Sequence, residues 1–73
     1  MKIDLHGYKH EEVERLLDMF LWDMMCKKVD QIEIVTGISD RMKSIVKSTC
    51  DEYGFSIVEK FYNPGSLIID MYN

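Results

Sequence analysis

Asp4 and His6, a carboxylate and an imidazole separated by one residue, are the side chains of this chain best suited to acid–base chemistry. They alternate with apolar Ile3 and Leu5, so a strand here would bury one pair and expose the other. Gly7 follows directly and allows a sharp exit from the strand. At the carboxyl end of a strand, the polar pair could exchange protons with a substrate hydroxyl or phosphate. The same alternation also fits the polar face of an ordinary strand.

After this turn, the apolar residues recur with the spacing of an amphipathic helix over residues 10–27. Glutamates in the first turns and lysines near the end suit the helix dipole. Opposite the apolar stripe lie Met19, Trp22 and Cys26. An apolar group with a tryptophan at such a position is either a rim of the core or a contact for a protein partner or a second copy of the chain.

The remaining pattern predicts three more strands and a second helix. Ser39 or Asp40 can cap this helix with a side-chain oxygen, and Gly54 stands where a left-handed residue would end it. The order βαβαββ predicts an α/β two-layer sandwich, in which a four-stranded mixed sheet carries both helices on one face. The predicted elements are strands over residues 2–6, 31–35, 55–62 and 66–72, helices over residues 10–27 and 40–53, and turns over residues 36–39 and 63–65.

The loops after the first two strands are predicted to emerge at the same end of the sheet, where open α/β sheets bind ligands. The second of these loops leads into the N-terminus of a helix, whose free N–H groups attract anions. Basic side chains near that helix start complete a predicted phosphate-binding edge. Its residues are Gly7, Thr36, Gly37, Ser39, Arg41, Lys43 and Lys47. The alternative is that Gly37 serves only the turn and that the basic side chains form only a solvated surface.

Length and charge limit the classes of function. The 73 residues are expected to form one domain with a small core. Thirteen acidic and nine basic side chains give a net charge of −4, which opposes tight non-specific binding to nucleic acid. The acidic residues concentrate in the first helix, whereas the segment from Arg41 to Lys47 contains no acid. The sequence therefore predicts an acidic protein with one local basic edge.

Cysteine usage and hydropathy predict the compartment. Cys26 and Cys50 have no CxxC spacing and are expected to be reduced thiols. The chain shows neither a signal peptide nor a transmembrane run, so a cytoplasmic location without a membrane partner is expected. No set of side chains has the spacing of a structural metal site, and three carboxylates that would converge on one site are not evident.

The opening Ile3-Asp4-Leu5-His6-Gly7 resembles the LDxHG signature of Smr (small MutS-related) domains. The turn over residues 36–39 stands where that family has its second signature, HGxG, or TGxG in plant pentatricopeptide-repeat relatives. The apolar spacing of the first helix and the closing strand are similar to the family as well, so the resemblance covers essentially the whole chain. It implies a βαβαββ two-layer sandwich, similar in shape to the C-terminal domain of bacterial translation initiation factor three.

The resemblance also implies nicking of DNA or endonucleolytic cleavage of RNA, and binding of branched DNA or structured RNA. Asp4 and His6 match the first signature. Asp4 would bind a divalent cation, Mg²⁺ or Mn²⁺, or act as the general base, and His6 would protonate the leaving oxygen or bind a phosphate. Two residues depart from the family pattern: Thr36 replaces the more usual histidine, and Ser39 replaces the last glycine.

Two other classes of function remain open. The net charge, the missing histidine and the apolar group on the first helix favour a non-catalytic interaction module that binds a protein partner or associates with itself. In that interpretation Asp4 and His6 only hydrogen-bond and orient the turn at Gly7. The second alternative is an acidic mimic of nucleic acid, which would block another enzyme through the carboxylates of the first helix.

Overall fold

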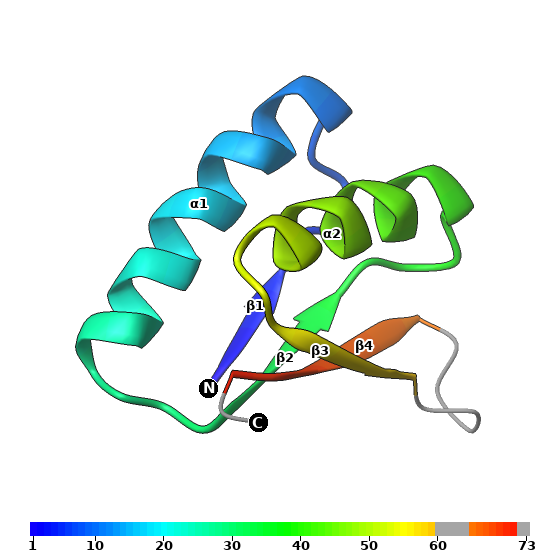
Figure 1. Ribbon diagram of the computed structural model, residues 1–73. Helices are drawn as coiled ribbons and strands as arrows, with labels where there is room; N and C mark the ends of the chain where they lie inside the picture. The colour runs from blue at the N-terminus through cyan, green and yellow to red at the C-terminus, as the bar shows by residue number, and fades with distance from the viewer. Residues whose placement is uncertain (60–64, 72–73) are drawn as a thin grey trace.

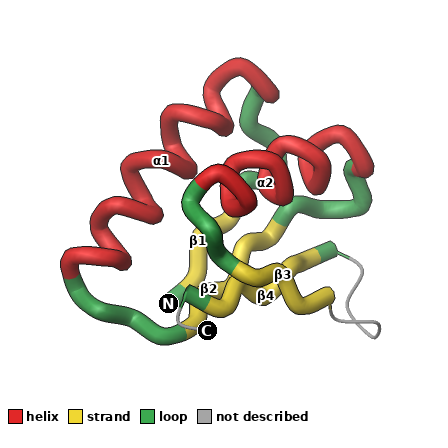
Figure 2. The backbone as a smooth tube through the Cα atoms, in the orientation of Figure 1, coloured by secondary structure: helices red, strands yellow, loops and turns green. Residues whose placement is uncertain are grey.

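The computed structural model of the protein describes residues 1–59 and 65–71, which form two layers (Figure 1). One layer is a four-stranded sheet and the other holds both helices, as the tube in Figure 2 shows. The predicted order βαβαββ and the α/β fold class are confirmed. The elements are β1 (Lys2–Asp4), α1 (His10–Cys26), β2 (Gln31–Val35), α2 (Asp40–Glu52), β3 (Ser56–Glu59) and β4 (Ser66–Asp70).

The sheet has the strand order β1-β2-β4-β3. β2 pairs with β1 in parallel and with β4 in antiparallel, and β3 pairs with β4 in antiparallel. The mixed sheet and the final hairpin are therefore as predicted. β4 is inserted between β2 and β3, and its Leu67 and Ile69 are buried, as central strands favour. The crossover through α2 consequently passes over one strand before the chain re-enters the sheet.

Several element ends differ from the predicted ones. The strand predicted over residues 2–6 ends at Asp4. The Leu5 amide still donates to the Val35 carbonyl, and the amide of His6 then donates to the Asp4 carboxylate, which turns the chain away from the sheet. α1 ends at Cys26 and α2 at Glu52, each one residue early. β3 begins at Ser56, and β4 ends at Asp70. The predicted end of the third strand, most of the 63–65 turn and residue 72 lie outside the described residues.

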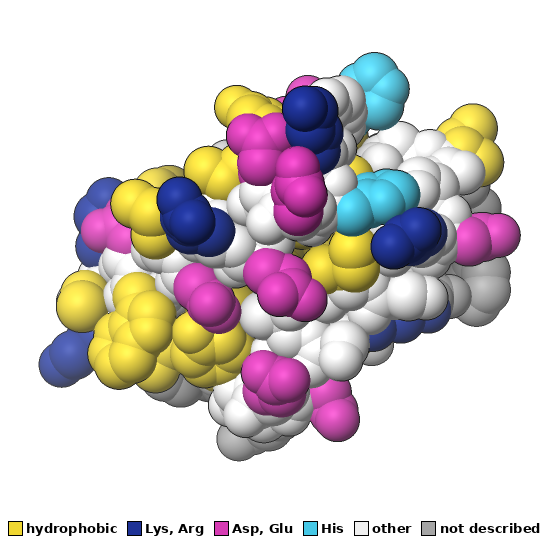
Figure 3. All heavy atoms as spheres, turned by 90° about the horizontal axis from the view of Figure 1, so that it is seen from above, with side chains coloured by type: hydrophobic (Ala, Val, Ile, Leu, Met, Phe, Trp, Pro, Cys, Tyr) yellow, Lys and Arg dark blue, Asp and Glu magenta, His cyan; other side chains and the backbone are white. Residues whose placement is uncertain are grey.

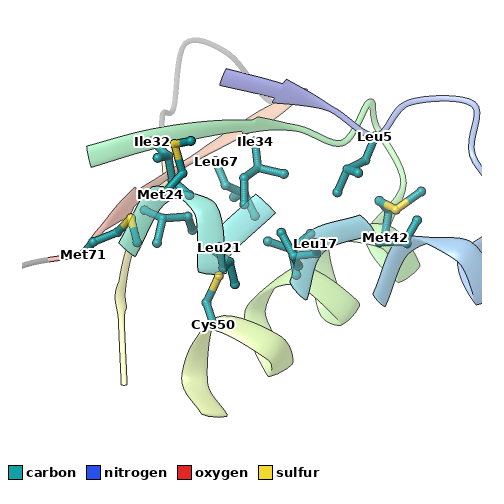
Figure 4. Close-up of a cluster of buried hydrophobic side chains, with 13 residues drawn as sticks. Leu5, Leu17, Leu21, Met24, Ile32, Ile34, Met42, Cys50, Leu67 and Met71 are labelled. Carbon is teal, nitrogen blue, oxygen red and sulfur yellow. The ribbon is translucent and has the colours of Figure 1, made fainter. Parts of the chain in front are cut away.

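The core lies between the helices and the sheet. The stripe predicted for the first helix faces inward: Leu17 and Leu21 are fully buried, and Leu16 and Phe20 are partly buried. Leu5 is fully buried as well, and Figure 4 shows it gathered with Leu17 and Met42 at one end of the cluster. Burial of each large aliphatic side chain contributes roughly 2 kcal/mol to folding. The burial of Leu5 therefore holds the backbone that carries its neighbours Asp4 and His6 in position.

Cys50 is fully buried on the inner side of α2, and this burial raises the pKa of its thiol from 9.0 to about 11. Below pH 9 the thiol is protonated in both the folded and the unfolded chain. Above it the unfolded chain releases the proton first, so the folded state loses stability as the pH rises toward 11. We expect this group alone to lower the free energy of unfolding by up to about 2.5 kcal/mol.

Urea unfolding of wild type, Cys50→Ala and Cys26→Ala in reducing buffer, from pH 8 to pH 11, measures this loss. The exposed Cys26 makes the second variant a matched control. Wild type and Cys26→Ala should lose stability more steeply than Cys50→Ala. Equal slopes for all three proteins would show that the buried thiol is not responsible.

Within the described part of the chain, neither helix has the length and apolar character needed to cross a membrane.

Candidate functional site

The first candidate residue, Asp4, ends β1. Its neighbours Ile3 and Leu5 face the core, so alternation directs the Asp4 side chain to the face of the sheet that carries no helix. Oδ1 of the carboxylate accepts a hydrogen bond of 2.9 Å from the backbone N–H of His6. The Leu5 amide still donates to the Val35 carbonyl at 2.8 Å. The carboxylate is thus held at the point where the chain leaves the sheet.

His6 packs against the loop that follows β2. Gly37 has a φ of +69°, and a Cβ built on it would lie 2.8 Å from Cδ2 of His6. Such a separation is shorter than real Cβ contacts, so the imidazole occupies the space that any larger residue at position 37 would need. This contact joins the two stretches singled out in the sequence, Asp4-Leu5-His6 and Thr36-Gly37, at one end of the sheet.

Thr36 is buried inside the loop. Its Oγ1 donates to the Gly37 carbonyl at 2.9 Å and lies 3.4 Å from the Gly65 carbonyl. The amides of Thr36 and Gly37 also donate to that Gly65 carbonyl, at 2.8 and 3.0 Å. These groups attach the loop to the start of β4. A phosphate bound here would therefore meet other amides, at the start of α2.

Ser39 is the N-cap of α2, one of the two caps predicted. Its side-chain oxygen accepts from the Met42 amide at 3.1 Å, and its carbonyl accepts from the Lys43 amide at 3.0 Å. Side-chain caps of this kind contribute about 1 kcal/mol to helix stability. The first amides of such a helix have no partner within the helix and carry partial positive charge. Ser39 thus fixes the direction in which the helix N-terminus points.

The predicted basic edge lies along α2. Arg41 and Lys47 are exposed and Lys43 is half-buried, while Asp40 adds one carboxylate to the first turn. Lys47 takes part in a further interaction within the protein. Arg41 and Lys43 follow the Ser39 cap directly, so they lie at the end of α2 next to the loop that His6 contacts. The positive charge at this end of the sheet is therefore local and small.

Two exposed apolar side chains in these loops were not singled out in the sequence. Ile38, between Gly37 and the Ser39 cap, is 84% exposed, and Tyr8, just after Gly7, is 48% exposed. The signal that points to them is an apolar residue inside a short glycine loop, where no helix or strand face can bury it. Exposed apolar and aromatic side chains beside a polar site can pack against unpaired bases.

Among residues 1–59 and 65–71, no three side chains of Asp, Glu, His or Cys are grouped closely enough to hold a metal ion. The site therefore consists of one carboxylate, one imidazole, a glycine loop and the start of α2.

The model of the Smr domain matches residues 3–64 of the 73-residue chain, a range that includes both the Asp4-Leu5-His6 stretch and the Gly37 loop. No curated protein and no solved structure matches the chain significantly. Since the family model covers most of the sequence and the fold has the expected βαβαββ order, the chain belongs to the Smr domain family.

Proposed function

We propose that this Smr domain binds structured RNA or branched DNA and cuts a phosphodiester bond next to Asp4 and His6. The observation that carries the proposal is the contact between His6 and Gly37, beside a carboxylate held by its own turn. An acid–base pair needs a fixed geometry relative to the bond it cuts, and both partners here stand on backbone that the core and the sheet hold in place. Membership of the Smr family supports a nucleic acid as the substrate.

The chemistry follows from the two side chains. With RNA, Asp4 removes the proton of a 2′-hydroxyl, whose oxygen attacks the adjacent phosphorus. The bond from phosphorus to the 5′-oxygen breaks, and His6 gives a proton to that oxygen. The products are a 2′,3′-cyclic phosphate and a 5′-hydroxyl. With DNA, a water molecule takes the place of the 2′-hydroxyl as the attacking group.

A divalent cation fits this site only in a limited way. Asp4 supplies one carboxylate, which is already hydrogen-bonded through Oδ1, and the described residues contain no group of three Asp, Glu, His or Cys side chains that could hold the ion. Mg²⁺ binds in this manner when water and substrate phosphates complete its coordination. The ion would then supply charge stabilisation of the phosphate, while Asp4 would hold it in place.

Substrate binding would use the start of α2 and the two loops. The amides of the first helical turn, with Arg41 and Lys43, would contact backbone phosphates, and Tyr8 and Ile38 would pack against bases. This set is small for a protein with a net charge of −4. We therefore expect binding that weakens strongly as the salt concentration rises.

A non-catalytic interaction module is the second candidate, and one observation favours it. The bond from the His6 amide to the Asp4 carboxylate is what a purely structural turn also requires. In this alternative the pair shapes the loop and takes no part in a reaction.

The experiment that tests the proposal offers the wild-type chain an end-labelled RNA hairpin, a DNA four-way junction and an unstructured strand of each. Each reaction is run with Mg²⁺, with Mn²⁺ and with EDTA. We expect mobility shifts and cut products with at least one structured substrate, and little with the unstructured strands. If no substrate is shifted or cut under any of these conditions, the domain has neither activity, and the interaction module becomes the supported function.

A further inference from the structure

The outer face of α1 carries an apolar surface, which we call the α1 patch. It consists of Met19, Trp22, Met25 and Cys26. Met19 is 65% exposed and Trp22 is 59% exposed, and the other two are also exposed. In Figure 3 hydrophobic side chains gather toward the left, over the C-terminal part of α1, with acidic and basic side chains beside them. The sequence predicted three of these residues as a contact, and Met25 extends the group.

Trp22 lies next to the seam between the two helices, where Tyr53 of α2 meets Asp18 of α1. The hydroxyl of Tyr53, at the end of α2, donates to Oδ1 of Asp18 on α1 at 3.0 Å. The side chain of Trp22 lies beside the same hydroxyl and acts to lower its pKa, against the larger effects of burial and Asp18, which raise it. The Tyr53 ring in turn stacks on Phe55, with a centroid separation of 5.5 Å. A large aromatic side chain fixed before binding loses little conformational entropy when a partner covers it.

Carboxylates outnumber basic side chains around the α1 patch: Glu14, Asp18, Asp23, Asp51 and Glu52 are exposed near it, against Arg15, Lys27 and Lys28. α1 contains five acidic residues and a single arginine, and Asp18 lies at the edge of the patch that faces α2. Asp51 and Glu52 are exposed at the end of α2 beside Tyr53. Asp23 is paired with Lys27 at 3.1 Å. The surface is thus an apolar centre whose rim carries more acidic than basic side chains. Two copies meeting through this face would bring their acidic rims together, which opposes self-association.

We propose that the α1 patch docks a short, basic amphipathic helix of a partner protein. Residues 19–26 span about 10 Å along the helix axis, a length that two or three turns of a partner helix cover. Apolar side chains of the partner would pack on Met19 and Trp22, and its lysines or arginines would face Glu14, Asp18 and Glu52. The complementary charge selects this partner over a second copy.

The test uses two synthetic 14-residue helices as probes, one made of leucine and lysine and the other of leucine and glutamate in the same pattern. Trp22 is the single tryptophan, so its fluorescence reports on the patch directly. We expect the lysine peptide to shift the Trp22 emission to shorter wavelength, and this shift should reach a plateau as the peptide concentration rises. The affinity of the peptide should fall at high salt. The glutamate peptide should leave the emission unchanged.

Two variants with the same change in charge locate the binding site. Met19→Lys alters the α1 patch, and Val58→Lys alters an apolar residue of β3 that is 49% exposed. Met19→Lys should lower the affinity for the lysine peptide at least tenfold. Val58→Lys should bind that peptide with the affinity of wild type. Equal weakening in both variants, or binding of neither peptide by wild type, overturns the proposal. A dimer in sedimentation that Met19→Lys dissociates overturns it as well, because the face would then bind a second copy.

Discussion

Replacing Gly37 by alanine should strongly reduce cleavage at the proposed site, whereas replacing Gly54 by alanine should leave the rate of cleavage unchanged. Both glycines have a positive φ, +69° and +78°, so both variants carry a backbone strain of about 1 kcal/mol. Their surroundings differ. A Cβ at Gly37 would stand 2.8 Å from Cδ2 of His6, whereas a Cβ at Gly54 would meet nothing within 4 Å. Gly54→Ala therefore shows the effect of backbone strain alone. Gly37→Ala combines the same kind of strain with a displacement of the His6 imidazole.

His6 is exposed, so its imidazole can swing away from an alanine at position 37 without unfolding the protein. A displacement of about 1 Å at a reacting group costs on the order of a hundredfold in rate, and we expect a loss of that size in cleavage. The imidazole resonances of His6 should shift in Gly37→Ala and stay in place in Gly54→Ala, while urea unfolding should show comparable losses of stability.

An unchanged His6 spectrum together with full cleavage in Gly37→Ala would contradict the role assigned to this contact. A spectrum that changes with no effect on cleavage would show that the contact exists and that the reaction does not need it.

Much of the fold could be predicted from local patterns. The apolar stripe that includes Leu17 and Leu21 predicted a helix and its inner face, and Ser39 predicted a cap, since both depend on residues a few positions apart. The place of β4 between β2 and β3 could not be predicted in this way. Periodicity predicts that a segment is a strand, but the choice of neighbour depends on packing between distant segments.

In the candidate site, too, the features set by neighbouring residues could be predicted, and the contacts between distant segments could not. Asp4 and His6 were evident from their types and from their place after an apolar alternation. The contact between His6 and Gly37 was not evident, because it joins segments 31 residues apart and depends on how β1 and β2 pair. The sequence predicts Thr36 as part of the phosphate-binding edge. It lies buried in the loop instead, because the backbone of Gly65 accepts its hydrogen bonds from 29 residues away.

The second large effect should follow from replacing Asp4 by asparagine. The amide oxygen of asparagine can still accept the hydrogen bond from the His6 amide, so the turn and the strand end should survive. The negative charge and the ability to take up a proton at neutral pH are lost. General base catalysis by a side chain contributes about 10²–10⁴-fold to a rate, so cleavage should fall within that range. Stability should change by less than about 0.5 kcal/mol, as expected for a surface substitution.

The most direct test of the proposed site is a single-turnover time course on whichever structured substrate the wild-type chain cuts, with wild type and Asp4→Asn side by side. Circular dichroism and urea unfolding on the same samples establish that both proteins are folded. We expect a rate at least a hundredfold lower for Asp4→Asn, with substrate binding retained. Equal rates for the two folded proteins would contradict a catalytic role for Asp4 and leave its carboxylate as a structural support of the turn.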